Sequence, residues 1–279
     1  MPRPQQDGAY WTLPLRGMAR AEAELRSQNV RIRRFFYDKH NESLFARICR
    51  KIQAADLDGL LVAPAAAEPF EKFLRSLPHR LPCVFFDSFL PGVPHLSSIG
   101  QDSFQSGVLS ARLMKMLVAA PGHVAIIKVR PKDFHIDDRV RGFQTYCRRC
   151  PGLTSEIYEI ERNGKPGAGA RLVRRIFARH PDVVGIFVSN ASTHRAAACV
   201  QSGGRGGKVH IIGYDLIDEN VRWLREGVID FLISQQPERQ GYEGIYTLYR
   251  HVVLKEPVPK KVTMQIDIIT SENVDFYRS

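Results

Sequence analysis

The sequence lacks any long apolar stretch. No apolar run approaches the roughly 18 residues that a membrane-spanning helix needs, and the first residues, MPRPQQDGAYW, lack the apolar core of a secretory signal. The sequence therefore predicts no membrane association. What remains is 279 residues, 44% hydrophobic and 25% charged, which is ordinary for a globular chain and long enough for two domains or two lobes.

Cysteine is scarce, with five residues in all. An odd number of cysteines without a secretory signal predicts reduced thiols and a cytoplasmic protein. Cys147 and Cys150 have C-x-x-C spacing, but they lie at the C-terminal end of a predicted helix, whereas a redox pair lies at a helix N-terminus, where the dipole lowers the thiol pKa. A structural zinc site would need a second pair with this spacing. We therefore interpret these thiols as incidental.

Motifs for catalysis and for phosphate binding are absent. The chain has no G-x-S-x-G turn and no Walker loop, and its nine histidines include no H-x-x-x-H or H-E-x-x-H pair. The glycine-rich stretch 202–207 precedes a strand, whereas a phosphate-binding loop follows one. Asp137 and Asp138 could hold a metal, but helix capping and the helix dipole explain them better. The sequence predicts no enzyme, no cofactor and no metal.

The chain is basic, with a net charge of +11. Its arginines are spread through the predicted helices and form no dense run with interleaved aromatic residues. We interpret them as a solvated surface, although weak, salt-sensitive binding to nucleic acid remains open.

Apolar runs rich in Val, Ile and Phe alternate with helical patterns along the chain. Predicted strands cover 30–37, 58–63, 83–87, 123–129, 155–161, 183–189, 208–214 and 229–234, with a last extended segment at 262–269. Predicted helices cover 9–27, 42–55, 68–77, 103–118, 137–149, 167–179, 192–202, 218–226 and 240–254. This alternation predicts parallel sheets with helices on both faces.

Ligands of such sheets bind at the carboxyl ends of the strands. Four polar residues follow predicted strands: Asp87, Asn190, Asp215 and Gln235. Asp and Asn also cap helices and start turns, which for Asn190 is as good an explanation as a ligand contact. Asp218 is the better cap for the helix at 218–226, which leaves Asp215 available for a ligand.

Carboxylates and amides together suit a neutral polyhydroxy ligand, because each ligand hydroxyl donates one hydrogen bond and accepts another. Aromatic faces would complete a sugar site, and the candidates for this role are Tyr10, Trp11 and Phe134.

Several segments resemble one family of transcription regulators. The stretch HIIGYDLIDENVRWLREGVIDFLISQQPERQGYEGIYTLYRHVVL is similar to the C-terminal half of the sensor domain of lactose-repressor-type (LacI/GalR) regulators. Shorter stretches are similar to other parts of that domain, namely YWTLPLRGMARAEAEL, SSIGQDSFQSGVLSARLM, RVRGFQTYC and QIDIIT. The resemblance covers about residues 8 to 277.

The resemblance implies a periplasmic-binding-protein-like type I fold: two doubly wound α/β lobes with parallel sheets, joined by three crossover strands. The N-terminal lobe would comprise 1–100 and 236–263, and the C-terminal lobe 101–235 and 264–279. A sugar or another small polar ligand would bind between them. The positions matched to ligand contacts are Asp87, Asn190, Asp215 and Gln235, with Tyr10 and Trp11 matched to a stacking pair.

Two departures from the family pattern stand out. Sugar-binding relatives often carry an arginine five residues before Gly142, where this chain has Asp137, so Arg139 and Arg141 are the candidates to replace it. The family also has a helix-turn-helix and a first strand ahead of the helix that begins near Tyr10. Only a short polar segment precedes that helix here, so we expect the natural start to lie upstream.

The resemblance implies a non-catalytic, sugar-sensing effector domain of a LacI-family regulator. Such a protein would be a cytoplasmic homodimer that binds operator DNA only through a helix-turn-helix absent from this chain. The alternative is the substrate-binding protein of a sugar ABC transporter, which has the same fold.

Overall fold

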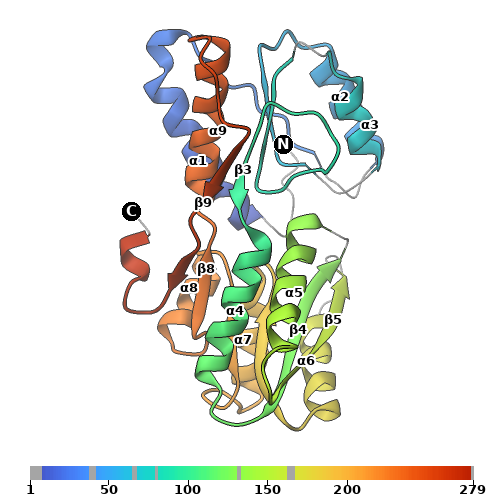
Figure 1. Cartoon of the computed structure of the whole chain (residues 1–279), viewed down its shortest axis with the longest axis vertical. Coiled ribbons are helices and arrows are strands. Elements are labelled where there is room, and N and C mark those ends of the chain that lie inside the picture. The colour runs from blue at the N-terminus through green and yellow to red at the C-terminus, as the bar shows by residue number, and fades with distance from the viewer. Residues whose placement is uncertain are drawn as a thin grey trace. The chain divides into compact units, whose positions relative to one another are not determined.

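The computed structural model describes residues 8–37, 42–64, 68–78, 81–130, 133–161 and 167–277, and the opening segment MPRPQQD lies outside this range. The chain forms two compact units (Figure 1). Unit 1 comprises Met1–Gln101 and Gln236–Met264, and unit 2 comprises Asp102–Gln235 and Gln265–Ser279, so the chain passes between them three times. The predicted α/β architecture of two parallel-sheet lobes is confirmed.

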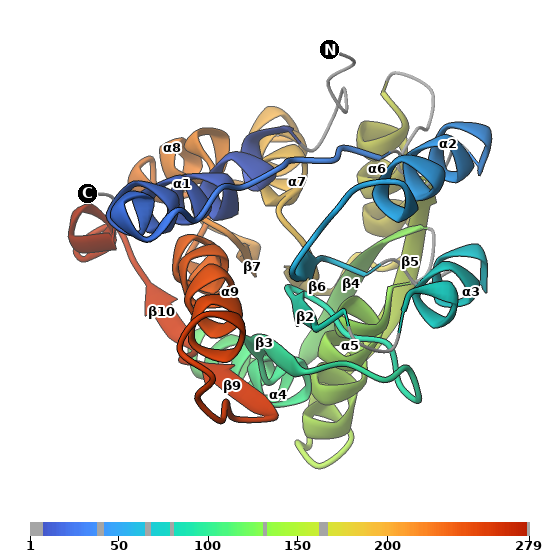
Figure 2. The ribbon, with the colours of Figure 1, turned by 90° about the horizontal axis from the view of Figure 1, so that it is seen from above.

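Unit 1 is built on a four-stranded parallel sheet. Its order is β1 (Leu60–Val62), β2 (Cys83–Phe86), β3 (Ser97–Gln101) and β9 (Lys261–Met264). Helices α1 (Gly8–Glu24) and α9 (Pro237–Val252) lie side by side (Figure 2). They pack Met18, Ala21 and Ile245 against the sheet residues Val84 and Ile99.

The helices α2 (Glu42–Gln53) and α3 (Glu68–Ser76) complete unit 1, together with a short 3-10 turn at Arg26–Gln28. Aromatic rings join these helices to the preceding segment. Phe45 of α2 stacks on Phe70 of α3 at 5.4 Å between ring centroids, and Tyr37 contacts both rings at 5.5 Å.

The strand predicted over 30–37 is wrong, since this segment contains no strand. Side chains rather than a neighbouring strand hold it. The Ile32 amide donates to the carboxylate of Glu22 (2.8 Å), and the Tyr37 hydroxyl donates to the carbonyl of Ala63 (2.7 Å). Apolar alternation reports a half-buried segment, but a strand also needs a backbone partner.

Unit 2 is built on a six-stranded sheet in the order β10, β8, β7, β6, β4, β5. These are Asp267–Ile269, Phe231–Ser234, His210–Tyr214, Val183–Val188, Gly122–Arg130 and Leu153–Glu161. All neighbours are parallel except β10, which pairs antiparallel with β8. The segment predicted as one extended piece at 262–269 is therefore two strands, β9 in unit 1 and β10 in unit 2.

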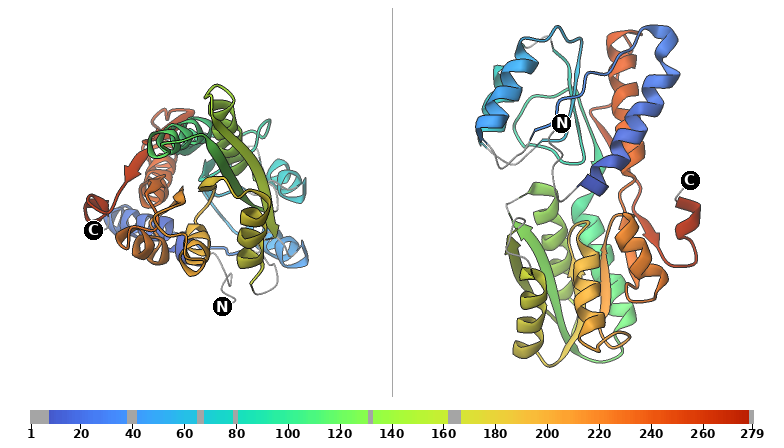
Figure 3. Two further views of the ribbon diagram at one scale, coloured as in Figure 1. Left: turned by 90° about the horizontal axis from the view of Figure 1, so that it is seen from below. Right: turned by 180° about the vertical axis from the view of Figure 1, so that it is seen from behind.

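Alternate residues of each unit 2 strand enter two different cores. On β4, Val124 and Ile126 face one cluster, whereas Ala125 and Ile127 face the other. Helices α4 (Ser103–Leu117) and α5 (Phe134–Cys147) cover the first face. Helices α6 (Ala168–Arg179), α7 (Thr193–Ser202) and α8 (Asp218–Arg225) cover the second (Figure 3), and a 3-10 turn at Val274–Tyr277 ends the described chain.

The start of α5 and the cap of α8 differ from the prediction. Helix α5 begins at Phe134 rather than at residue 137, which places Asp137 in its first turn. Helix α8 begins at Asp218, so Ile217 is the N-cap and the predicted capping role of Asp218 is wrong. A carboxylate in the first turn still interacts favourably with the helix dipole, so the residue type fits either position. None of the described helices is long and apolar enough to cross a membrane.

Helices α4 and α5 approach each other through a pair of glycines. A Cβ on Gly107 would lie 2.0 Å from the carbonyl oxygen of Arg139, and a Cβ on Gly142 would lie 2.0 Å from that of Phe104. Backbone meets backbone at both points, so no side chain can move aside. The glycines therefore fix how closely α5 sits against α4.

We predict that Gly107→Ala destabilises the protein by at least about 2 kcal/mol, because the added methyl group forces the two helices apart. The matched control is Gly169→Ala in α6, where the nearest atom to an added Cβ is 3.9 Å away. That change should stabilise the protein by up to about 1 kcal/mol through helix propensity. Urea unfolding of both variants measures the difference, and a Gly107→Ala variant as stable as the control would contradict the close helix contact.

Candidate functional site

Asp87 directly follows strand β2 of unit 1 and has a left-handed backbone, with φ of +66°. Its amide donates to the side-chain oxygen of Gln240 (2.8 Å), a fully buried residue of α9. The hydroxyl of Tyr10, from the first turns of α1, donates to Asp87 Oδ1. Two helices thus hold one half-buried carboxylate at the carboxyl end of the sheet.

Asp215 directly follows strand β7 of unit 2 and repeats this arrangement, with φ of +70°. The side-chain nitrogen of Asn220, in α8, donates to the carbonyl oxygens of Asp215 (3.0 Å) and Tyr214 (2.9 Å). Gln235, at the end of β8, donates from Nε2 to Asp215 Oδ1 (3.0 Å). The carboxylate is buried, with 3% of the residue exposed.

Asn220 also joins α8 to the loop after β6. Its Oδ1 accepts from the backbone amide of His194 (2.7 Å), and its nitrogen lies 3.0 Å from the carbonyl of Ala191. Burial lowers the pKa of His194, so its imidazole is neutral at neutral pH. One fully buried amide therefore holds the loops that follow two neighbouring strands.

Arg139 lies at the centre of the unit 2 set, with 1% of the residue exposed. Its guanidinium donates to the side-chain oxygen of Gln235 (2.8 Å) and to the carbonyl of Ser189 (3.1 Å), and it lies 3.9 Å over the ring of Tyr214. Its Nε has no hydrogen-bond acceptor among the described residues. The amide of Gln235 thus bridges the guanidinium of Arg139 and the carboxylate of Asp215.

The ring of Tyr214 packs against the guanidinium of Arg139. Burial raises the pKa of Tyr214, so the phenol stays protonated, and its oxygen lies 2.7 Å from the hydroxyl of Ser106. Sequence patterns alone do not identify four residues of these networks, because each is an ordinary residue type for the interior of a strand or helix. They are Tyr214, Ser106, Asn220 and Gln240.

The remaining predicted residues occupy less central positions. Asn190 accepts from the amide of Ser192 (3.1 Å), which is a local turn contact of the kind that competes with a ligand role. Trp11 packs its ring edge-on to Phe86 at 6.2 Å, as part of the unit 1 core. Phe134 is half-buried at the first position of α5.

The two candidate arginines have opposite environments. Arg141 is exposed over 64% of its side chain and pairs with Asp138 at 3.0 Å. The neighbouring aspartate, Asp137, makes an ion pair with Lys128. Cationic partners therefore account for both Asp137 and Asp138, and Arg139 is the arginine that lies among the strand-end residues.

Burial makes several thiols of this chain weaker acids. All five are free, and burial raises the pKa of Cys147 to about 11 and that of Cys83 to about 12. Thiols of this kind are protonated at neutral pH and react poorly as nucleophiles.

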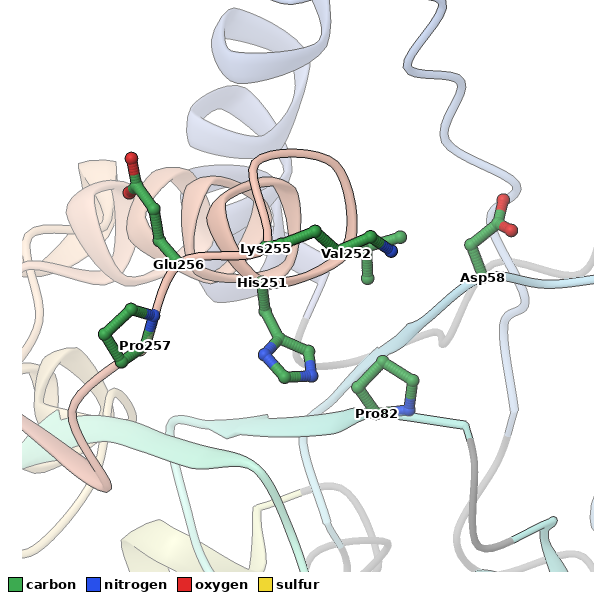
Figure 4. A pocket seen from close by; sticks show the side chains of 7 residues that line it. All are labelled: Asp58, Pro82, His251, Val252, Lys255, Glu256 and Pro257. Carbon is green, nitrogen blue, oxygen red and sulfur yellow. The ribbon is translucent and has the colours of Figure 1, made fainter.

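Unit 1 also has a pocket of about 520 Å³ (Figure 4). Asp58 and Pro82, which line it, precede β1 and β2, and His251 and Lys255 come from the end of α9. The pocket therefore lies at the amino edge of the sheet, away from Asp87 at the carboxyl edge. It holds none of the predicted site residues.

A model of the periplasmic binding protein domain matches residues 1–256. The chain belongs to this family. Its members are binding or sensing proteins rather than enzymes, in agreement with the predicted absence of catalysis.

Curated proteins and many solved structures are similar to this chain. The xylose/arabinose-binding protein XylF of Sulfolobus acidocaldarius is 24% identical over 242 residues, which are 79% of this chain and 58% of that protein, so this chain spans less than two thirds of it. The D-ribose/D-allose-binding protein of Pseudomonas aeruginosa is 23% identical over 84% of this chain and 76% of its own length.

Among solved structures, a protein of Bacteroides fragilis provisionally assigned as a LacI transcriptional regulator is 28% identical. It superposes with a TM-score of 0.90 and covers 98% of this chain and 96% of its own. The glucose-galactose binding protein GanP of Geobacillus stearothermophilus is 26% identical, with a TM-score of 0.85 and the same coverage.

Arg139 and Arg141 offer a matched test of the unit 2 network. We predict that Arg139→Met destabilises the protein by about 2–4 kcal/mol, because the Asp215 carboxylate and the Gln235 oxygen stay buried without their positive partner. Arg141→Met removes only a surface ion pair and should change stability by less than about 1 kcal/mol. Chemical denaturation of both variants decides, and equal losses would contradict the central place of Arg139.

Proposed function

We propose that the chain is a sugar-binding sensor domain of a transcription regulator of the LacI type. The observation that carries this proposal is an aspartate at a strand end in each unit, Asp87 in unit 1 and Asp215 in unit 2. Each has a left-handed backbone, and a buried side-chain amide forms a hydrogen bond with its main chain. Non-glycine residues adopt this conformation at a cost in free energy, and such strain concentrates at functional sites.

The chemistry of the two sets supports a polyhydroxy ligand. Carboxylate oxygens accept hydrogen bonds from sugar hydroxyls, while the guanidinium of Arg139 and the amide of Gln235 donate. The orphan Nε of Arg139 adds a buried donor that a ligand oxygen would satisfy. The relatives named for xylose, arabinose, ribose, allose, glucose and galactose support the same ligand class.

The regulator is favoured over a transporter component by two observations. The Bacteroides fragilis protein superposes with a higher TM-score than GanP, 0.90 against 0.85, and five unpaired thiols suit a reducing cytoplasm. In this proposal the protein is a cytoplasmic homodimer, and ligand binding changes its affinity for operator DNA by linkage.

The second candidate is the substrate-binding protein of a sugar ABC transporter. The two curated relatives and GanP are named as sugar-binding proteins, which favours it. The codons upstream of Met1 separate the two functions. A helix-turn-helix encoded there would support the regulator, and an apolar secretory segment would establish the transporter function instead.

The test of sugar binding is a thermal-shift panel of pentoses, hexoses and sugar acids, followed by calorimetry on the best ligand. We expect micromolar affinity, about −8 kcal/mol. Asp215→Asn and Asp87→Asn should each weaken it by about tenfold or more, because each replaces a charged acceptor by a neutral one. Asparagine tolerates the left-handed conformation, so the backbone is preserved.

Asp182→Asn is the control, since this carboxylate is exposed over 64% of its side chain and precedes β6 at the opposite edge of the sheet. Its affinity should equal that of the unchanged protein. Sugar binding that survives both Asp215→Asn and Asp87→Asn would place the ligand elsewhere.

A further inference from the structure

Two histidines and a glutamate meet at the amino edge of the unit 2 sheet. His123 is the second residue of β4, Glu156 lies near the start of β5, and His180 caps the C-terminus of α6 just before β6. One ligand atom from each lies within 4.8 Å of the other two. The strand-end residues Asp215 and Gln235 are at the other edge of the same sheet.

An ion pair explains only part of this cluster. His180 Nε2 lies 3.1 Å from Glu156 Oε2, which also accepts from the hydroxyl of Tyr158 (3.1 Å). The ring of His123 stacks on that of His180 at 3.8 Å between centroids. His123 is 95% buried, yet its Nε2 has no hydrogen-bond partner among the described residues.

The other ring nitrogen of His123 indicates which tautomer is present. Nδ1 lies 3.1 Å from Thr154 Oγ1, and this hydroxyl lies 3.5 Å from the carbonyl of Gly122, which can only accept. This geometry allows Thr154 to donate to Gly122 and to accept from His123 Nδ1. Nε2 then carries a buried lone pair, and a histidine oriented by a hydrogen bond at its other nitrogen is the usual form of a metal ligand.

We propose that His123, His180 and Glu156 bind a divalent transition-metal ion such as Zn²⁺. Two imidazoles and one carboxylate form a three-residue set that Zn²⁺ accepts, with further positions left to solvent, whereas Ca²⁺ and Mg²⁺ prefer all-oxygen sites and Cu⁺ prefers sulfur. Ligand atoms around a tetrahedral ion lie about 3.3 Å apart, and the ion lies near the plane of each imidazole. Binding therefore requires a modest closure of the three atoms and a rotation of the stacked rings of His123 and His180 out of their parallel arrangement.

The surroundings allow that closure. Glu156 also pairs with Arg179, which lies 3.4 Å from Oε1 and is exposed over 64% of its side chain. A surface pair of this kind is weak and gives way readily to a bound ion. The side chains of His180 and Glu156 are 24% and 36% exposed, so the ion has a route from solvent to the buried nitrogen of His123.

The experiment is a titration of the reduced, tag-free protein with Zn²⁺, followed by calorimetry and by metal analysis after dialysis, and repeated with Co²⁺ for its visible spectrum. We expect one ion per chain and a low-symmetry Co²⁺ spectrum without thiolate bands. His123→Gln and His180→Gln should each weaken binding at least tenfold. His180 is partly exposed, so its variant reports on the metal even if His123→Gln fails to fold.

Two controls separate this site from others on the chain. His210→Gln removes a histidine that lies 2.9 Å from the carboxylate of Asp230, a pair that belongs to no cluster of three ligands among the described residues, and Zn²⁺ binding should be unchanged. Cys150→Ser should also leave it unchanged. Full affinity in His180→Gln, or a cobalt–thiolate band lost in Cys150→Ser, would overturn the proposal.

Discussion

The burial of one positive charge constrains much of unit 2. A guanidinium taken out of water costs several kcal/mol unless acceptors surround it. For Arg139 these acceptors come from separate elements, the carbonyl of Ser189 after β6 and the amide of Gln235 after β8, while the ring of Tyr214 at the end of β7 faces the cation. Three parallel strands must therefore end at the same level, and the glycine contact between α4 and α5 holds the arginine at that level.

The aspartates at the strand ends meet a separate requirement, which comes from the backbone. A parallel strand that turns sharply after its last buried residue needs a left-handed residue, and aspartate accepts that conformation while leaving a carboxylate at the edge. The turn persists because a buried amide, Gln240 for Asp87 and Asn220 for Asp215, bonds to its main chain. Units with different sheets thus reach a similar local arrangement, and this supports the proposed role of both carboxylates in ligand binding.

The sequence reveals the strand ends but not how side chains meet there. Apolar runs predict β2, β7 and β8 well, so Asp87, Asp215 and Gln235 can be placed from pattern alone. The same pattern fails over 30–37, because burial without a neighbouring strand gives no ladder. Arg139 was separable from Arg141 in principle, since it lies four residues before the buried Phe143 on one helical face. Asn220 was not, because its partners are backbone atoms of loops distant in sequence.

The two edges of the unit 2 sheet bear different chemistry on shared strands. His180 lies shortly before strand β6 and Ser189 directly after it, and His123 is the second residue of strand β4. An ion at the amino edge would contact residues of unit 2 alone, so it would stabilise that unit as a whole. Binding at one site changes affinity at another only if it distinguishes two states of the protein. All three candidate metal ligands belong to one unit, so the ion would bind equally well in any two states that differ only in the relation of the two units. The ion would therefore act on stability rather than on the sugar response.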